Sequence, residues 1–369
     1  MNNVAITGYG NTKFSQEEIP IESLMLEATK SLFDQNSNLN QKDIDAVLVT
    51  TNDNSKYLAS ILSEIAGIQP NAAHTVESLC NSGTNGIVSA YSYIASGLGD
   101  IALVVGAERR NSPGQILEWD KSRGEYKHPI FWGSIFTKSH KRKFGTTEEE
   151  LAIVSAKNHK NARDNPFAYS DKVYSIDELM NSKILTEDLR VSDCSRPCSG
   201  ASAVLLTSEK VASKFSETPV WIKGIGQKTL SAGFTKSQDF SSMASTIEAS
   251  KIAFEMAKMN ARDVDVAEIH DAFTVCELMA IEDLGFVEKG KGAQFVKTLY
   301  ETEDRKINPR GGLIGAGHPL GATGIAQVIE TTLQLQGKAE KRQIENARIG
   351  LIHNMSAAAT SSTVLLLES

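Results

Sequence analysis

The stretch that organises this sequence is Glu77-Ser78-Leu79-Cys80-Asn81-Ser82-Gly83-Thr84-Asn85-Gly86, which runs directly into Ile87-Val88-Ser89-Ala90-Tyr91-Ser92-Tyr93-Ile94-Ala95-Ser96. Its second half is apolar or small on nearly all sides, which predicts a buried helix. Its first half is rich in Asn, Ser, Thr and Gly, the residues of helix starts and tight turns. We therefore expect Cys80 at or near the N-terminus of a buried helix.

The position of Cys80 suggests a chemical role. Free backbone N–H groups at a helix start carry partial positive charge. This charge favours the thiolate, which is the nucleophilic form of cysteine. On this stretch alone two interpretations stay open: a nucleophile, or a small buried side chain that fills space, as most free cysteines do.

Length and composition indicate which classes of protein this chain can belong to. The chain has 369 residues with 41% hydrophobic and 22% charged residues, an ordinary globular composition. Its net charge is −7, which makes nucleic acid an unfavourable partner. Its apolar runs are too short to span a bilayer, and a strand pattern begins at Val4 with no targeting segment before it. We expect a cytoplasmic protein with four reduced cysteines.

The first half of the chain alternates predicted strands and helices. We expect strands at 4–8, 44–50, 101–107 and 201–207 and helices at 21–35 and 59–66. Gly8 and Gly10 follow the first strand, but Lys13 stands where a dinucleotide-binding fingerprint has its third glycine, so we expect no such site. Between about Arg109 and about Cys198 the alternation is lost, which indicates an insertion.

The second half repeats the first in outline. Predicted strands at 220–226, 264–270, 348–352 and 363–368 and helices at 245–259 and 325–336 follow the same order. Two similar halves of this size indicate an internal duplication, packed as layers of sheet and helix.

A second informative stretch is Asn308-Pro309-Arg310-Gly311-Gly312-Leu313-Ile314-Gly315-Ala316-Gly317-His318-Pro319-Leu320-Gly321-Ala322-Thr323-Gly324. So many glycines indicate backbone that bends sharply or approaches another group closely. His318 is restricted by Pro319 and stands before a predicted helix, where it is suited to accept a proton or polarise a carbonyl. A glycine-rich turn with a structural histidine is the alternative.

Two further motifs are weak when each is taken alone. His270-Asp271-Ala272-Phe273 follows a predicted strand, and His353-Asn354-Met355-Ser356 lies between two strands. Together with the Cys80 and His318 stretches they give the chain a resemblance to the thiolase family over nearly its whole length. His270-Asp271-Ala272-Phe273 is similar to the motif of the archaeal and sterol-carrier-protein-type branch.

The resemblance implies an α/β fold, the duplicated five-layered (αβαβα) thiolase fold with an inserted loop domain. We expect residues 1–108 and 199–217 to form the N-terminal half, 109–198 the inserted loop domain, and 218–369 the C-terminal half.

The resemblance also implies a mechanism. Cys80 would carry the acyl group, and His318 would assist thiolate formation and then help to stabilise an enolate. His270 would hold a water that donates to the same oxygen. Backbone N–H groups of Cys80 and near Ser356 would bind the tetrahedral oxyanion, with Gly317 and Asn354 in the surrounding loops.

One departure from the family pattern concerns the second catalytic cysteine. Most thiolases have a cysteine where this chain has Asn354, and the related branch has one where this chain has Ala272. An amide cannot titrate. We therefore expect His353 or His318, rather than a second thiol, to move the α-proton, or else the enzyme does different carbon-bond chemistry. Cys276 is interpreted as helix core.

Cys194 and Cys198 could suggest a metal site. The chain has two other cysteines, one of them assigned to catalysis, and no histidine lies close to Cys194 and Cys198 in sequence, so we expect no zinc or other metal site. The basic run at 138–143 meets either the phosphates of coenzyme A, an acidic partner surface or solvent. We mark as substrate-binding candidates His128, His140, Lys141 and Arg142.

The leading hypothesis is an acetyl-CoA C-acetyltransferase, that is, an acetoacetyl-CoA thiolase, with no cofactor besides its coenzyme A thioester substrates. The alternatives are an acyltransferase on another acceptor, a longer-chain 3-ketoacyl-CoA thiolase, and a non-catalytic scaffold that binds a partner. The resemblance implies a homodimer or dimer of dimers, and a complex with an HMG-CoA synthase and a small OB-fold/zinc-ribbon protein.

Overall fold

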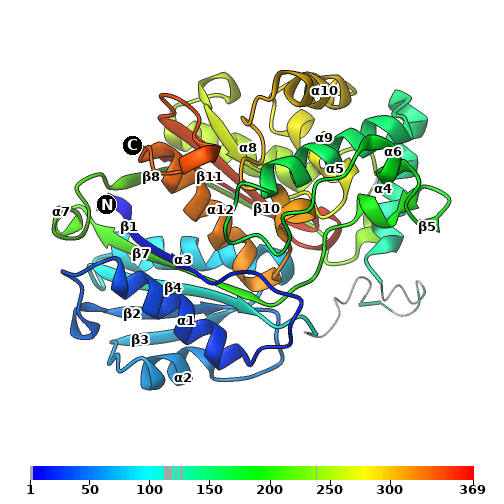
Figure 1. The fold of residues 1–369 in the computed structure, drawn as a ribbon. Coiled ribbons are helices and arrows are strands. Elements are labelled where there is room, and N and C mark those ends of the chain that lie inside the picture. Colours follow the sequence, from blue (N-terminus) through cyan, green and yellow to red (C-terminus); the bar gives the residue numbers. More distant parts are fainter. Residues whose placement is uncertain (1–2, 112–118, 121, 123, 125–127, 238) are drawn as a thin grey trace.

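The computed structural model describes residues 3–111, 119–120, 122, 124, 128–237 and 239–369 (Figure 1). The predicted insertion includes positions outside this described part. The first half contains β1 (Val4–Asn11), α1 (Ile21–Asp34), β2 (Ala46–Thr50), α2 (Leu58–Ile65), β3 (Ala72–Val76), α3 (Ser82–Ala95), β4 (Ile101–Glu108) and β7 (Gly200–Ser208). The segment between β4 and β7 contains α4 (Ile130–Phe144), α5 (Glu148–Ala162), α6 (Ile176–Met180), β5 (Ile184–Thr186) and β6 (Leu189–Arg190).

The second half follows the short helix α7 (Ala212–Phe215). Its elements are β8 (Val220–Thr229), α8 (Ala244–Ala257), β9 (Val266–Glu268), α9 (Thr274–Asp283), α10 (Gly292–Thr302), α11 (Gly312–Ala316), α12 (Leu320–Leu335), β10 (Ile349–Met355) and β11 (Ser361–Glu368).

The strand order confirms the predicted duplication. The described strands form a sheet in the order β3-β2-β4-β7-β1-β8-β11-β10-β9, beside a separate β5-β6 pair. Counted outward from its centre, the sheet has β1-β7-β4-β2-β3 on one side and β8-β11-β10-β9 on the other. Each strand of the first half except the edge strand β3 therefore has its counterpart in the second. The two half-sheets meet through a short antiparallel pairing of Ala5 with Trp221 and Ile6 with Val220.

Three large hydrophobic cores lie between successive layers of sheet and helix. The first half-sheet packs one face against α1 and α2, and α8 and α9 pack with the outer face of the second half-sheet. Residues of α3 and α12, such as Ile87 and Ile325, fill the core between the half-sheets. Figure 1 accordingly shows α3 and α12 between the strands, with α2 and α10 on opposite sides of the molecule. This arrangement agrees with the five-layered thiolase fold.

Buried sequence runs explain the strands and helices. All eight residues of β4 are buried, because helices cover both faces of its half-sheet. In α1 the buried residues recur at helical spacing, namely Ile21, Leu24, Met25, Ala28 and Leu32. β3 is the one strand of the nine-stranded sheet for which we predicted no strand, and the separate β5-β6 pair was not predicted either. It lies at the edge of the sheet with partly exposed residues, so it lacks the continuous apolar run of a buried strand.

The two central helices touch at their N-terminal ends through glycine. A Cβ added to Gly83 of α3 would lie 3.0 Å from the backbone nitrogen of Gly324 in α12. A Cβ added to Gly324 would lie 2.7 Å from the backbone nitrogen of Thr84. Glycine at both positions therefore lets the start of α3, which carries the Cys80 turn, lie against α12, which follows His318.

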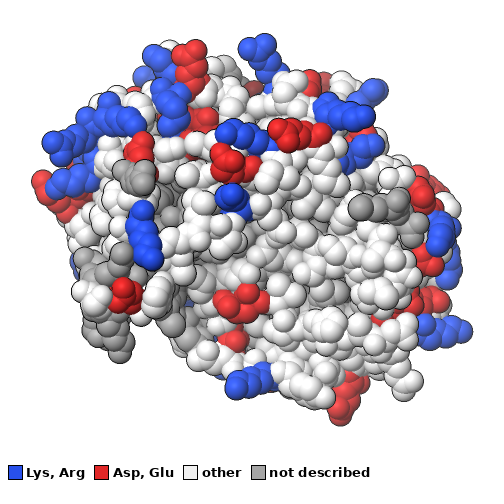
Figure 2. Space-filling model, turned by 180° about the vertical axis from the view of Figure 1, so that it is seen from behind, with Lys and Arg blue, Asp and Glu red and all other residues white. Residues whose placement is uncertain are grey.

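The surface carries charges of both signs. Figure 2 shows lysine and arginine side chains mixed with acidic ones along the rim of one face, with a broad uncharged area between them. Among the described residues, no helix combines the length and apolar character needed to cross a bilayer.

Candidate active site

A pocket of about 370 Å³ opens onto Cys80 between the central helices and the segment that joins β4 to β7. Its walls include Arg109, His128, Trp132, Leu185, Cys194, Cys198, Ala272, Phe273 and His318. Phe273 packs edge-on against Trp132 with ring centroids 4.7 Å apart. The pocket size lies in the range of small-molecule sites, and aromatic and aliphatic side chains form much of its wall.

Cys80 lies in a 3₁₀ turn (Leu79–Asn81) immediately before α3, as the sequence predicted. The backbone N–H of Ser78 donates to the Ser82 hydroxyl at 2.8 Å, and that hydroxyl donates to the Leu79 carbonyl at 2.6 Å. Asn81 donates to Thr363 of β11 at 3.1 Å. Leu79 has a φ of 55°, which bends the chain sharply. These contacts hold the buried thiol at the start of the central helix.

The fold brings Cys80, His270 and His318 together. The Cys80 sulfur and one nitrogen of each imidazole all lie within 4.8 Å of one another, and all three residues are buried. The two imidazole rings meet edge to face, with centroids 5.3 Å apart. Cys80 comes from the first half of the chain and both histidines from the second. Three of the four predicted catalytic residues therefore form one cluster.

The hydrogen bonds of His318 determine which nitrogen carries its proton. Its Nδ1 lies 2.7 Å from the Thr323 hydroxyl, which in turn donates to the Pro319 carbonyl at 2.9 Å. A hydroxyl has a single proton, so Thr323 must accept from Nδ1–H of His318. The Nε2 lone pair is then unprotonated, and Nε2 has no hydrogen-bond partner among the described residues. His318 is consequently placed as a base.

The surroundings keep both imidazoles neutral. Burial, aided by the nearby Arg310 guanidinium, lowers the pKa of His318 to about 3. Burial and the neighbouring His318 and His353 rings lower the pKa of His270 well below its usual value, while the Asn354 amide opposes that shift. A neutral imidazole offers a lone pair at neutral pH, which is what a base or a metal ligand requires.

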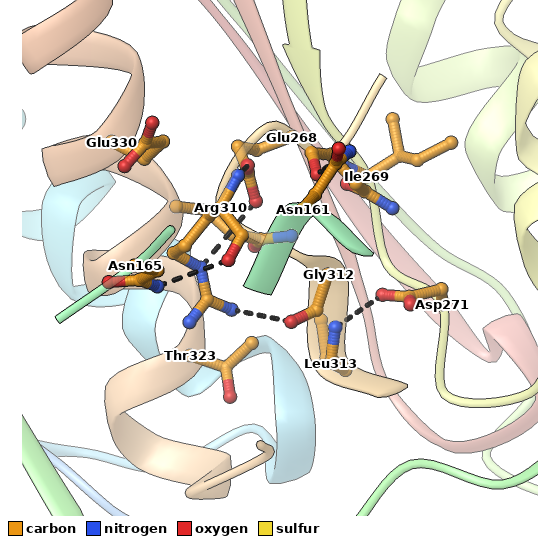
Figure 3. Close-up of polar contacts among 12 residues, drawn as sticks. Asn161, Asn165, Glu268, Ile269, Asp271, Arg310, Gly312, Leu313, Thr323 and Glu330 are labelled. Carbon is orange, nitrogen blue, oxygen red and sulfur yellow. Dashed lines mark hydrogen bonds and ion pairs between the residues drawn. The ribbon is translucent and has the colours of Figure 1, made fainter. Parts of the chain in front are cut away.

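Arg310, whose charge acts on His318, is held by a buried network (Figure 3). Its backbone N–H donates to Glu268 at 2.9 Å, and its guanidinium donates to the Gly312 carbonyl at 3.2 Å. Asn165 donates to the Arg310 carbonyl at 3.1 Å. Burial raises the pKa of Glu268 to about 7, although Arg310 opposes the shift. These contacts fix the loop that leads into the His318 motif.

Asp271 ties the His270 loop to the His318 loop. Its carboxylate accepts the backbone N–H group of Leu313 at 2.6 Å (Figure 3) and that of Ile314 at 3.2 Å, at the start of α11. Asn158 of α5 donates to the same carboxylate at 2.7 Å. Burial and the neighbouring Glu277 raise the pKa of Asp271 well above its usual value. The residue next to His270 thus positions the glycine-rich loop that carries His318.

Replacement of Asp271 by alanine is expected to lower the free energy of unfolding by about 3–5 kcal/mol, because it leaves three buried donors without their acceptor. Asp271→Asn retains one acceptor oxygen and should lose less. The midpoint of urea unfolding measures both. Equal midpoints for Asp271→Ala and the wild type would contradict this role of the carboxylate.

Asn354 and Ser356 lie beside the cluster with their own partners. Asn354 donates to Gln327 of α12 at 2.7 Å, and its Oδ1 has no hydrogen-bond partner among the described residues. The Ser356 hydroxyl donates to the Ser78 carbonyl at 2.8 Å, so it braces the Cys80 turn. The Ser356 N–H donates to the Ser361 carbonyl at 2.9 Å. This N–H is therefore engaged, and an oxyanion donor near Ser356 has to be a different N–H.

The structure does not place His353 in the cluster with Cys80. Its Nε2 lies 2.9 Å from the Thr246 hydroxyl of α8, and its Nδ1 accepts the backbone N–H of His270 at 3.5 Å. Both nitrogens are thus occupied by buried contacts. Burial lowers the pKa of His353 to about 3. The predicted role of His353 in α-proton transfer stays a prediction, and these contacts favour His318 for that role.

A His353→Gln variant shows how this one buried imidazole makes the free energy of unfolding depend on pH. Below pH 6.5 the unfolded wild type binds a proton at His353 that the folded protein does not bind until about pH 3, so the wild type loses stability as the pH falls. The variant has no such loss. We expect the stability advantage of the wild type, measured by urea unfolding, to shrink between pH 7.5 and pH 5. An advantage that does not change with pH would contradict the shifted pKa.

Gly317 and the pocket cysteines lie close together. Gly317 has a φ of 100°, and a Cβ there would lie 2.8 Å from the Cys198 sulfur. Burial raises the pKa values of Cys194 and Cys198 to about 12. Cys276 is fully buried in α9, as predicted, and burial raises its pKa too. These three thiols are therefore poor nucleophiles at neutral pH.

Iodoacetamide is expected to alkylate Cys80 well before the other cysteines, because Cys80 lies in the cluster with the His270 and His318 imidazoles, whereas burial raises the pKa values of the other three thiols. Peptide mapping by mass spectrometry after brief exposure at pH 8 measures the order of labelling. Prior incubation with acetyl-CoA should protect Cys80 alone. Faster labelling of Cys194 or Cys198 would overturn the assignment of Cys80 as the reactive thiol.

Of the four predicted substrate-binding residues, one lines the pocket and three do not. His128 lines the pocket. The interpretation of His140 as a pocket residue is corrected, because its ring is buried between Thr146 at 2.8 Å and Glu282 at 3.4 Å. Lys141 lies 3.6 Å from Asp188 and 3.8 Å from Glu148, and Arg142 is exposed; neither is among the pocket residues.

Two positioning residues were missed at the sequence level. Thr323 sets the protonation of His318, and the charge of Arg310 acts on it; both stand within the quoted glycine-rich stretch. Thr323 could have been identified from the sequence, because it follows His318 by five residues across a predicted helix start. Arg310 gave no such signal, since its partner Glu268 comes from another element.

Comparison with known proteins agrees with this geometry. Residues 3–210 match the family model "Thiolase, N-terminal domain", and residues 226–369 match "Thiolase C-terminal domain-like". The chain is 33% identical to an acetyl-CoA acetyltransferase of Methanothermobacter thermautotrophicus, with 99% of each chain covered. It is 31% identical to sterol carrier protein 2 of Bos taurus, over 96% of this chain and 70% of that one.

The fold also matches a solved structure. An Ltp2-ChsH2(DUF35) aldolase superposes with a TM-score of 0.89 over 100% of this chain and 98% of the other, at 21% identity, which shows the shared fold. The family models together cover nearly the whole chain, and they match the halves that the sheet topology defines. This chain therefore belongs to the thiolase family.

Proposed function

We propose that the protein is an acetyl-CoA C-acetyltransferase that joins or cleaves acetyl units through an acyl group carried on Cys80. The observation that carries this proposal is the buried cluster of the Cys80 thiol with the His270 and His318 imidazoles at a pocket of about 370 Å³. The relatives that are acetyl-CoA acetyltransferases support the same reaction.

The first half-reaction follows from the His318 tautomer. Nε2 of His318 accepts the Cys80 proton, and the sulfur attacks the thioester carbonyl of acetyl-CoA. The carbon–sulfur bond to coenzyme A breaks, and the leaving thiolate takes the proton back from His318. The products are acetyl-Cys80, free coenzyme A and a neutral His318 whose Nε2 is again unprotonated.

The second half-reaction uses the same base. His318 Nε2 removes an α-proton from a second acetyl-CoA, and the resulting carbanion attacks the acetyl carbonyl on Cys80. A carbon–carbon bond forms, the bond to Cys80 breaks, and the thiolate recovers the proton from His318. His270 lies beside the reacting atoms, where it or a water that it holds stabilises the enolate oxygen. This route needs no second catalytic cysteine.

The test is thiolysis with the purified protein. Acetoacetyl-CoA and coenzyme A should yield two acetyl-CoA per acetoacetyl-CoA consumed, as measured by chromatography of the reaction mixture. Cys80→Ala is the control. Formation of acetyl-Cys80 without turnover would indicate transfer to a different acceptor. Absence of both adduct and turnover would indicate a non-catalytic scaffold.

A longer-chain 3-ketoacyl-CoA thiolase is the second candidate, and the apolar side chains of the pocket favour it. Trp132, Leu185 and Phe273 line the wall near Cys80. Comparison of kcat/KM for 3-ketoacyl-CoA substrates of increasing chain length separates the two. The acetyl-CoA C-acetyltransferase assignment requires the highest value with acetoacetyl-CoA.

For partners we propose a homodimer or dimer of dimers that associates with an HMG-CoA synthase and a small OB-fold/zinc-ribbon protein. This rests on the family resemblance, and the solved Ltp2-ChsH2(DUF35) aldolase is loosely in line with it. Light scattering at micromolar concentration tests the first part, since a 40.0 kDa particle would be a monomer. Co-purification with each tagged candidate tests the second.

A further inference from the structure

The catalytic cluster has the donor set of a metal site. One thiol and two imidazoles are ligands that Zn²⁺ prefers, and a site with three protein ligands leaves the fourth position open. Nε2 of His318 and Nδ1 of His270 are buried and have no hydrogen-bond partner among the described residues. The Thr323 contact fixes the His318 proton on Nδ1, so the Nε2 lone pair is available to an ion.

The distances permit a shared ion. Three atoms that all lie within 4.8 Å of one another fit within a circle whose centre is at most about 2.8 Å from each. Zinc lies about 2.3 Å from sulfur and about 2.0–2.1 Å from nitrogen in proteins. Side-chain movements of less than about 1 Å would therefore bring all three ligands to bonding distance, without any change in the fold.

We propose that Cys80, His270 and His318 bind Zn²⁺ in the substrate-free protein, and that the bound ion blocks acylation of Cys80. Binding forms one sulfur–zinc and two nitrogen–zinc bonds, and the Cys80 thiol releases one proton to solvent. No group is oxidised or reduced. The ion occupies the sulfur lone pair that would attack a thioester and the Nε2 lone pair that would accept the proton, so metal and acyl group exclude each other.

Cys194 and Cys198 lie near each other in sequence but lack histidines nearby, which is why the sequence predicts no metal site. The present ligands are far apart in sequence and come together only in the fold.

The donor set predicts which ions bind. Thiolate and imidazole favour Zn²⁺ and Co²⁺, whereas Mg²⁺ and Ca²⁺ favour oxygen ligands and waters. Cys80 and His318 line the pocket, so a water or a small thiol that enters the pocket could complete the tetrahedron.

Titration of the reduced, substrate-free protein with Co²⁺ tests the site without any measurement of activity. We expect one Co²⁺ per chain, a thiolate-to-cobalt absorption band in the near ultraviolet, and loss of that band when Zn²⁺ is added. A hundredfold excess of Mg²⁺ should leave it unchanged. Iodoacetamide treatment of the wild type should abolish the band, which provides a test that requires no mutation.

Variants identify the ligands. Cys80→Ser should remove the band, and His270→Gln and His318→Gln should each weaken Co²⁺ binding at least tenfold. Cys194→Ser is the matched control, because it removes a different thiol of the same pocket and should keep the band. Circular dichroism checks that each variant is folded. A band that persists in Cys80→Ser, or equal Co²⁺ affinity in the wild type and both histidine variants, would overturn the proposed site.

The inhibitory part of the proposal is tested by acylation. Zn²⁺ should lower the rate at which acetyl-CoA labels Cys80, with relief by excess acetyl-CoA or by a chelator, and protein already acetylated should no longer bind Co²⁺. This second experiment depends on the proposed acyl transfer, whereas the cobalt titration does not. Unchanged acylation rates in the presence of bound Zn²⁺ would refute the inhibition.

Discussion

Replacement of Cys80 by alanine is expected to abolish both acyl-enzyme formation and turnover. Cys80 is the thiol that lies within 4.8 Å of the His270 and His318 imidazoles, at the start of a central helix. In a serine protease whose catalytic residues act as a unit, removal of the nucleophile lowers kcat on the order of a million-fold. We expect a comparable loss of kcat here.

Intact-mass measurement after mixing with acetyl-CoA gives the direct readout. The wild type should gain one acetyl group, mapped to Cys80 by peptide analysis, and Cys80→Ala should gain none. Cys276→Ala is the matched control, because that thiol is buried in α9 and takes no part in the proposed chemistry. An adduct on Cys194, Cys198 or Cys276, or a Cys276→Ala variant that stops condensation, would require a different mechanism.

Replacement of His318 by alanine should slow both half-reactions by about a hundredfold to ten-thousandfold, which is the usual contribution of a general base. The proton on Nδ1 is held by Thr323, so Nε2 is the lone pair that accepts the Cys80 proton. Single-turnover measurement of the acetyl adduct reports the first step, and condensation from preformed acetyl-enzyme reports the second.

The comparison with His353 makes this test specific. Both nitrogens of His353 are engaged with Thr246 and the His270 backbone, so His353→Gln should form acetyl-enzyme and condense it at a rate closer to wild type than His318→Ala does. Added imidazole should partly restore acylation in His318→Ala, where a space is left for it. A His353 variant that acylates normally but fails to condense would assign the α-proton to His353 instead.

Local sequence patterns were sufficient for much of the fold and for part of the site. The Cys80 turn and its helix follow from residues adjacent in the chain, and the two halves follow from a repeated order of apolar segments. The edge strand β3 was missed because exposure at the sheet edge removes the apolar run that marks a buried strand.

The roles of individual histidines depended on contacts between distant residues. The Thr246 hydroxyl contacts the His353 ring from 107 positions away in the sequence. Glu282 contacts the His140 ring from 142 positions away. No local periodicity carries that information, since it arises only when α8 packs on the second half-sheet and α4 packs on α9. The tautomer of His318 was likewise inaccessible without the geometry of the Thr323 hydroxyl.

The contact between Gly83 and Gly324 has a consequence for how the two halves share the site. α3 and α12 occupy equivalent places in the two halves, and their N-terminal ends touch at these glycines. One helix start carries Cys80 and the other follows His318. A nearly symmetric pair of helices therefore supports a single asymmetric reaction centre, to which each half contributes different chemistry.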